Sequence, residues 1–120
     1  MSIIPANDLT RRHCIPCEGG VPPLSRKQVE QYLSGLSQWK LTADGKRVRR
    51  EWRVKDFAAG LDFFNRVGRL AEDENHHPDL HLKNYRDLAI EIGTQAIDGL
   101  SENDFILAAK IDSLPVELKT

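Results

Sequence analysis

The chain has 120 residues, a formal net charge of −1 and 40% hydrophobic residues, a composition typical of one soluble domain. A net charge so close to zero gives no overall field that would attract nucleic acid or an anionic membrane, and no apolar run approaches the roughly 20 residues of a membrane span. The first residues, Met1 to Asp8, lack the basic region and apolar core of a secretory signal. We therefore expect a cytoplasmic protein.

Residues 1–24 are predicted to form an irregular arm, mobile or laid across a partner, because four prolines and two adjacent glycines interrupt any regular pattern. The arm contains Cys14 and Cys17 in a CxxC arrangement, which occurs in zinc sites and redox pairs. No second CxxC follows, and structural zinc normally takes four ligands. The favoured interpretation is a pair of free thiols that folding does not require, so no metal is expected.

The first helix is predicted to begin after Ser25, which can form a capping box with Gln28, and to end near Gly35. Its apolar residues recur at helical spacing: Val29, Tyr32, Leu33 and Leu36. This spacing indicates a helix that carries packing rather than chemistry.

A hairpin is predicted next, because Asp44-Gly45 is a strong turn signal. Alternation along its second strand, residues 46–54, separates two faces: Val48, Arg50, Trp52 and Val54 on one, and Arg47, Arg49, Glu51 and Arg53 on the other. Arg50 is the exception on the apolar face, and we expect it at the sheet margin with its stem packed and its head in water. The arginine row is interpreted as a solvated strand face, with an acidic partner as the alternative.

The longest helix is predicted over about 18 residues after the N-cap Asp56. An apolar stripe should cover the sheet: Phe57, Leu61, Phe64, Val67, Leu70 and Ala71, with Phe63 beside it. Pro78 favours an extended His77, and the negative end of the helix dipole favours a protonated imidazole at His76. Histidine exchanges protons near neutral pH, so this pair is a candidate proton-transfer site. On the pair alone, simple capping of the helix C-terminus is the favoured interpretation.

Two further strands are predicted over residues 79–82 and 88–95, and a last helix from Ser101 to residues 112–114. In the second strand, Leu88, Ile90, Ile92 and Thr94 should face the helices, and Ala89, Glu91, Gly93 and Gln95 the opposite side. Asp104 is interpreted as a capping acid of the last helix rather than a catalytic group. The order α-β-β-α-β-β-α predicts an α+β domain over residues 25–114, with helices on one face of a four-stranded, mainly antiparallel sheet and a tail over residues 115–120.

Several residues between Trp39 and Asp104 follow a recognisable spacing. They are Trp39, Lys55-Asp56-Phe57, Phe63, Arg66-Val67, Glu72, His76-His77-Pro78, Tyr85, Gln95 and Asp104. The pattern resembles the signature of the pterin-4a-carbinolamine dehydratase family, over the chain from Leu24 to Ile111. The resemblance implies the same fold and a homodimer through strand edges, which can pair into a tetramer.

The resemblance also implies residue roles for the expulsion of water from a 4a-hydroxytetrahydropterin, which needs one acid and one base. His76 and His77 would be the catalytic pair, and Trp39, Glu72, Asn75 and Pro78 would bind the pterin. No metal or cofactor is required. Gln95 stands where the family has a third histidine or an aromatic ring. Glutamine exchanges no proton near neutral pH, so weak or absent activity is expected.

Two segments, His77 to Leu82 and Gly99 to Ile111, are similar to the dehydratase-like proteins that assist Rubisco assembly with α-carboxysomes and in chloroplasts. This resemblance implies a Rubisco assembly factor, or chaperone, that binds Rubisco subunits and associates with the carboxysome. The alternative is an active 4a-hydroxytetrahydrobiopterin dehydratase with pterin as its ligand. A dimeric regulatory module is a third option, which no basic or helix-turn-helix feature supports.

Overall fold

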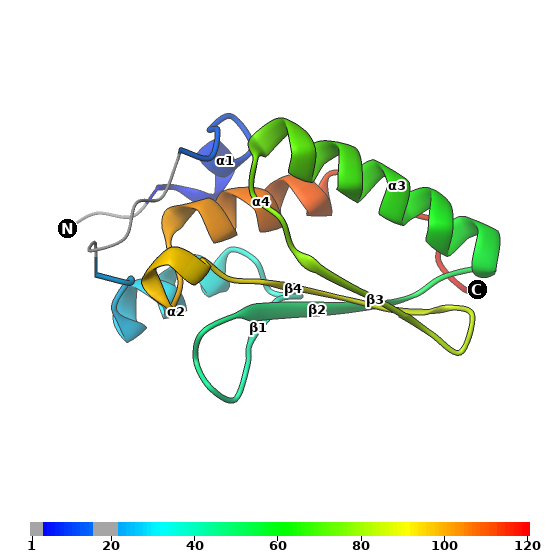
Figure 1. Cartoon of the computed structure of the whole chain (residues 1–120), viewed down its shortest axis with the longest axis horizontal. Coiled ribbons are helices and arrows are strands. Elements are labelled where there is room, and N and C mark those ends of the chain that lie inside the picture. Colours follow the sequence, from blue (N-terminus) through cyan, green and yellow to red (C-terminus); the bar gives the residue numbers. More distant parts are fainter. Residues whose placement is uncertain (1–3, 16–21) are drawn as a thin grey trace.

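The computed structural model describes residues 4–15 and 22–120. Within these residues the sheet has four strands in the order β1-β2-β4-β3, with every neighbouring pair antiparallel. The strands are β1 (Lys40–Leu41), β2 (Val48–Arg53), β3 (Asp79–Lys83) and β4 (Asp87–Ile92). Figure 1 shows α3 (Phe57–Glu74) and α4 (Glu102–Asp112) over one face of this sheet. The predicted α+β fold is confirmed.

The helices begin where capping residues were predicted. Ser25 Oγ accepts a hydrogen bond from the amide of Gln28 at 3.2 Å, and Gln28 Oε1 accepts one from the amide of Ser25 at 3.0 Å. This capping box opens α2 (Arg26–Ser34), which packs beside α4 through stacked rings of Tyr32 and Phe105, 4.6 Å apart. Each capping side chain satisfies an amide that has no partner within its helix, so local sequence alone sets these boundaries.

The face of α3 that meets the sheet differs from the predicted stripe. The buried positions are Ala59, Gly60, Phe63, Val67, Ala71 and Glu74, whereas Phe57 and Leu61 are 49% and 45% exposed. The helix approaches β4 so closely that a Cβ added at Gly60 would lie 3.3 Å from Leu88 Cδ2. The prediction for Phe57 and Leu61 is therefore wrong, because this contact requires small side chains at the start of the helix.

The alternation of the central strand is confirmed. Leu88, Ile90, Ile92 and Thr94 are all buried beneath the helices. The strand itself ends at Ile92, and the chain continues into a short 3-10 helix, η1 (Gln95–Ile97). Gln95 is therefore an exposed residue of this turn rather than a strand residue.

Arg50 lies on the apolar face of β2 as predicted, but its head is not in water. The guanidinium lies 4.6 Å from the ring centroid of Trp52 and donates to Asp112 Oδ1 at 2.5 Å. Its side chain is only 19% exposed. The expectation of a solvated head fails because Asp112, at the end of α4, reaches across to β2 and neutralises it.

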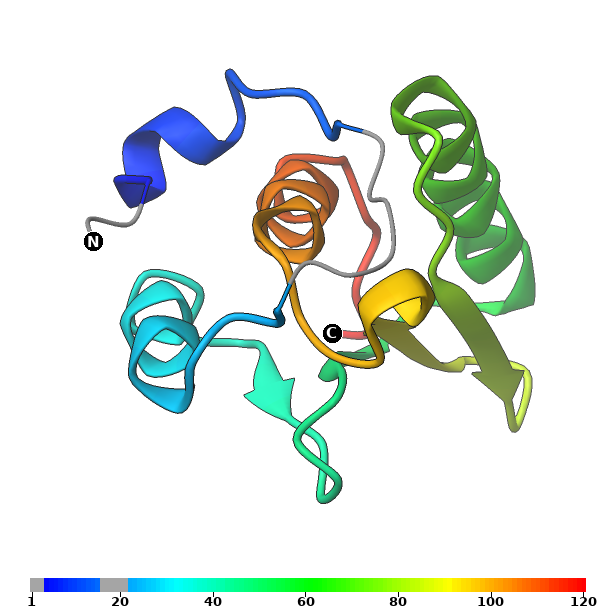
Figure 2. The same ribbon diagram turned by 60° about the vertical axis from the view of Figure 1, so that its left-hand side comes forward.

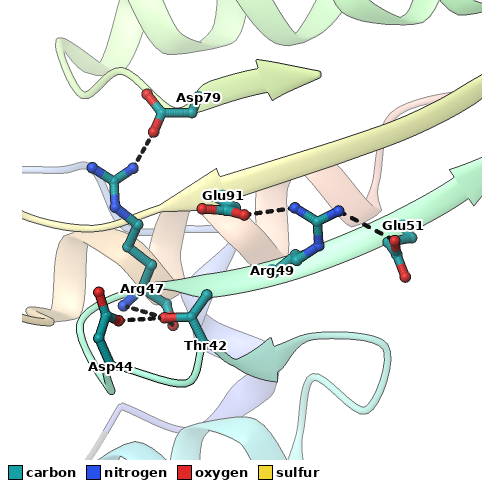
Figure 3. Close-up of polar contacts among 7 residues, drawn as sticks. All are labelled: Thr42, Asp44, Arg47, Arg49, Glu51, Asp79 and Glu91. Atoms are coloured by element: carbon teal, nitrogen blue, oxygen red, sulfur yellow. Dashed lines mark hydrogen bonds and ion pairs between the residues drawn. The ribbon is translucent and has the colours of Figure 1, made fainter. Parts of the chain in front are cut away.

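The arginine row on the open face of the sheet is neutralised by carboxylates of neighbouring strands (Figure 3). Arg49 donates to Glu91 on β4 at 2.5 Å and to Glu51 at 3.2 Å, and Arg47 bonds Asp79 on β3. Solvent-exposed pairs of this kind add little stability. They leave little free positive charge for an acidic partner, which favours the interpretation as a solvated strand face.

The two chain ends lie against the domain. Residues 4–15 contain helix α1 (Ala6–Leu9), and Ile4 and Leu9 are buried in the core; Figure 2 shows this segment passing over α4 toward the end of α3. Within the predicted arm, α1 is the one regular element among residues 4–15, and Ile4 and Leu9 pack into the core of the domain. Cys17 lies outside the described residues. At the other end, Leu118 pairs with Val54 beyond β2.

Candidate active site

The end of α3 fixes the position of the first histidine. Asn75 follows the last helical residue in the left-handed conformation, with φ 51° and ψ 40°. The amide of His76 then donates to the carbonyl of Ala71 at 3.1 Å. This is a Schellman ending, in which asparagine tolerates the positive φ that usually calls for glycine. Asn75 thus turns the chain so that His76 points toward α4.

His76 forms a close pair with a buried carboxylate. Its Nε2 lies 2.6 Å from Oδ1 of Asp104, and the two side chains are 13% and 0% exposed. An ionised carboxylate only accepts hydrogen bonds, so Nε2 carries the hydrogen. Nδ1 is then the nitrogen that can exchange a proton with a substrate, while Asp104 orients the ring and stabilises the imidazolium that forms.

Asp104 is itself held by two donors. Its Oδ2 accepts from Thr94 Oγ1 and from the amide of Ser101, both at 2.8 Å. Ser101 Oγ lies 2.8 Å from Thr94 Oγ1 and is left as the donor of that bond. The capping role expected from the sequence is present, but it uses only one carboxylate oxygen. The spacing from Ser101 to Asp104 revealed the cap and carried no signal that the other oxygen meets His76.

His77 forms a separate pair at the surface. Its Nε2 lies 2.5 Å from Oε2 of Glu72, and the side chains are 58% and 76% exposed. Such a pair in water contributes little to stability, and the exposed ring of His77 is accessible from solvent. Glu72 acts on the orientation of His77, while Pro78 is half-buried and leads directly into β3.

A hollow of about 380 Å³ surrounds the two histidines. It is lined by Ile15, Asn75, His76, His77, Gly93, Thr94, Gln95, Ala96 and Asn103. Of the residues predicted for the site, the structure brings together Asn75, both histidines and Gln95. The exposed amide of Gln95 can orient a ligand with its one acceptor and two donors. Glu72 and Pro78 lie outside this lining.

Trp39 lies elsewhere, in the core. It is 2% exposed, packs edge-on against Trp52 with ring centroids 5.9 Å apart, and donates from Nε1 to Asp112 Oδ1 at 2.9 Å. Its position joins α4 to the sheet. A tryptophan suits both a pocket wall and a core, so residue type alone did not distinguish the two places.

His81 does not join the other two histidines. It pairs across the sheet with Ala89 and borders a separate hollow on the open face of the sheet. Among residues 4–15 and 22–120, no group of three histidine, cysteine or acidic side chains is arranged to hold a metal ion. In the same part of the chain, no helix is long and apolar enough to cross a membrane.

A second buried carboxylate, Glu74, lies beside the pocket and was missed by the sequence analysis. Its side chain is 4% exposed and accepts from Lys110 Nζ at 2.6 Å and from the amide of Cys14 at 2.7 Å, with His13 Nδ1 at 3.1 Å. Burial alone raises the pKa of Glu74, but these hydrogen bonds outweigh it and lower the pKa to about 2. The residue stays charged because all three partners are donors.

The thiol next to Glu74 has the opposite behaviour. Burial raises the pKa of Cys14 to about 12, and the negative charge of Glu74 adds to the effect. The thiolate is the reactive form of cysteine, so Cys14 is a poor nucleophile and metal ligand at neutral pH. This surrounding favours the interpretation of an unreactive thiol over a redox or zinc role.

Comparison with known proteins agrees with this geometry. Residues 22–114 match the family model described as "Pterin 4 alpha carbinolamine dehydratase". A protein of Arabidopsis thaliana named "Pterin-4-alpha-carbinolamine dehydratase 2, mitochondrial" is 47% identical over 92% of this chain, which spans 60% of that protein's length. A protein of Halorhodospira halophila named "Putative pterin-4-alpha-carbinolamine dehydratase" is 46% identical over 88% of this chain and 96% of its own length.

A solved structure supports the fold. The crystal structure of a "transcriptional coactivator/pterin dehydratase" from Brucella melitensis superimposes with a TM-score of 0.71 over 76% of this chain, at 23% identity. On the family match and the two relatives together, this chain belongs to the pterin-4a-carbinolamine dehydratase family.

Proposed function

We propose that this protein dehydrates a 4a-hydroxytetrahydropterin. The observation that carries the proposal is the 2.6 Å contact between His76 and the fully buried Asp104 at the edge of a hollow of about 380 Å³. A carboxylate-backed imidazole in a concave site is suited to proton transfer. The surface pair of His77 and Glu72 adds a second proton-exchanging group beside it.

The reaction balances with these two groups. His76 takes the proton from a ring nitrogen through Nδ1, and the released electron pair forms a double bond to the neighbouring carbon. The carbon–oxygen bond of the hydroxyl group breaks as His77 protonates that oxygen, and water leaves. Each proton transfer by a positioned side chain contributes about 10² to 10⁴ in rate. Gln95 contributes hydrogen bonds only, so turnover is weaker than with a third imidazole.

A dehydration assay on matched variants tests the proposal. His76→Gln removes the group paired with Asp104, and we expect the rate to fall on the order of 10²-fold. His81→Gln is the matched control, because His81 lies on the open face of the sheet, and its rate should equal that of the wild type. Equal rates for His76→Gln and the wild type would contradict the proposed function.

Assistance of Rubisco assembly is a second candidate function, with Rubisco subunits as partners and a carboxysome-associated location. The observation that favours it is Gln95, which lines the pocket without the proton chemistry of histidine. Within the similar segment Gly99 to Ile111, residues 103–109 are all buried, so they support the fold and the contact would fall on other surfaces. Retention of Rubisco by the immobilised wild type and by His76→Gln alike supports this function, and loss of Rubisco from both columns contradicts it.

A further inference from the structure

The segment His13 to Ile15 is held on the domain by two buried side chains from different helices. Asn103 recognises the backbone of Ile15 in both directions: its Oδ1 accepts from the amide at 3.0 Å and its Nδ2 donates to the carbonyl at 2.6 Å. Glu74 accepts from the amide of Cys14 at 2.7 Å. These contacts form a clamp on the main chain, in which Asn103 acts as a neighbouring strand would.

The clamp lies at the end of α3 and the start of α4, which also carry His76 and Asp104. Asn103 directly precedes Asp104 in the first turn of α4, and Glu74 lies two residues before His76 at the end of α3. Lys110 ties the two helices together by donating to Glu74 at 2.6 Å. The groups that hold the arm are therefore neighbours in the chain of the groups that hold the histidine.

The clamp is built into the interior rather than laid on the surface. Asn103 and Glu74 are both buried. A buried amide or carboxylate is costly unless its hydrogen bonds are made. For Asn103, both side-chain polar atoms are bonded to Ile15. The domain is thus arranged around a docked arm, although the match to the family model begins only at residue 22.

The docked arm presents one apolar side chain to the pocket. Ile15 lines the hollow around His76 and is nevertheless 71% exposed. Single exposed apolar residues are ordinary on a protein surface. This one differs because Asn103 bonds both the amide and the carbonyl of Ile15. These bonds hold the side chain of Ile15 at the rim of the pocket, where a bound flat heterocyclic ring would cover it.

We propose that the segment His13 to Ile15 is part of the active site. Asn103 and Glu74 are positioning residues that hold this segment across the ends of α3 and α4, and Ile15 is a wall of the pocket that contacts the bound ring. The ring contact rests on the proposed function, because it takes the hollow as the pterin site. The coupling between the docked arm and His76 stands on the geometry alone.

The test uses the full-length protein and the substitution Asn103→Ala, with Asn65→Ala on the exposed side of α3 as the matched control. Hydrogen exchange of the Cys14 amide reports docking, the ring ¹⁵N resonances of His76 report the pair, and titration with 7,8-dihydrobiopterin reports the pocket. Asn103→Ala removes both bonds to Ile15, so it should speed exchange of the Cys14 amide about tenfold and shift the His76 resonances. The dissociation constant for 7,8-dihydrobiopterin should rise by a similar factor. Asn65→Ala should change none of the three.

A second variant addresses the case in which Asn103→Ala does not fold. Ile15→Pro removes the donor from the arm and leaves Asn103 in place, and the exposed side chain of Ile15 makes no large contribution to the core. In either variant, a released arm with unchanged His76 resonances and unchanged affinity overturns the inference, and so does rapid Cys14 exchange in the wild type. Absence of dihydrobiopterin binding by the wild type would contradict the proposed function. The His76 resonances would still test whether the docked arm is coupled to His76.

Discussion

Glu74 should make the stability of this protein depend on acid in a defined direction. Its pKa is lowered from the ordinary 4.5 to about 2 in the folded protein. A carboxyl group with a lowered pKa stabilises the fold fully above its unfolded pKa, and the contribution is lost as the pH falls through the folded value. The window for Glu74 therefore runs from about pH 5 down to about pH 2.

The magnitude follows from the same values. A tenfold change in acid dissociation corresponds to about 1.4 kcal/mol, so the lowered pKa of Glu74 is equivalent to about 3 kcal/mol of unfolding free energy. Screening by solvent takes little from this figure, because the side chain is 4% exposed and its partner Lys110 is 12% exposed. This is a large share of the 5 to 15 kcal/mol that stabilises a typical domain.

Urea unfolding of the wild type and of Glu74→Gln, measured at several pH values between 7 and 3, checks the reasoning. At neutral pH the variant should be less stable by about 3 kcal/mol or more, because it also leaves Lys110 buried without its counterion. The difference should shrink as the pH falls. Asp73→Asn, the exposed neighbour on the same helix, should follow the wild type. Parallel pH profiles for the wild type and Glu74→Gln would refute the account of this buried cluster.

Three further expectations concern Gln95, Cys14 and the edges of the sheet. Gln95→His should raise the dehydration rate, on the order of 10²-fold where the new imidazole meets the reacting proton, and an unchanged or lower rate contradicts this role for Gln95. In a Cys17→Ser background, iodoacetamide should alkylate Cys14 slowly at pH 8 because burial raises the pKa of its thiol to about 12, and Asn103→Ala should speed the reaction; rapid wild-type alkylation counts against the docked arm. Sedimentation at micromolar concentration should show at least a dimer, because β1 and β3 are the two edges of the sheet, and a pure monomer is the contrary result.

Much of the fold could be predicted because its signals are local. Three helix starts are marked by capping residues, namely Ser25, Asp56 and Ser101. Each cap depends on residues only three positions apart. The alternation of β4 similarly reports which face is buried without knowledge of the partner strands. The buried face of α3 could not be found this way. Phe57 and Leu61 match an amphipathic stripe as well as Phe63 and Val67 do, and only the close approach at Gly60 decides between them.

The candidate site was predictable in its histidines and not in what holds them. His76 and His77 stand out in the sequence because Pro78 follows them. The residues that hold the site do not, because Asp104 and Glu74 bond histidines that are 28 or more positions away in the chain. Thr94 gains its role only through its bond to Asp104. One sequence signal did exist for Glu74. It continues the spacing of Phe63, Val67 and Ala71 along the truly buried face of α3, so a correct stripe would have placed an acid in the interior.

The buried pair of His76 and Asp104 bears on the proposed role of Gln95. A buried carboxylate costs stability unless its oxygens are bonded. Here Oδ2 of Asp104 accepts hydrogen bonds from Thr94 and the Ser101 amide, and Oδ1 contacts His76. An apolar residue at position 104 would avoid that cost, but it would also remove the cap of α4, because Oδ2 accepts from the Ser101 amide. The cap needs only Oδ2, so the contact of Oδ1 with His76 is the part of this arrangement that supports the proposed proton transfer. Under that proposal, Gln95 alters the rate and the His76–Asp104 pair carries the chemistry.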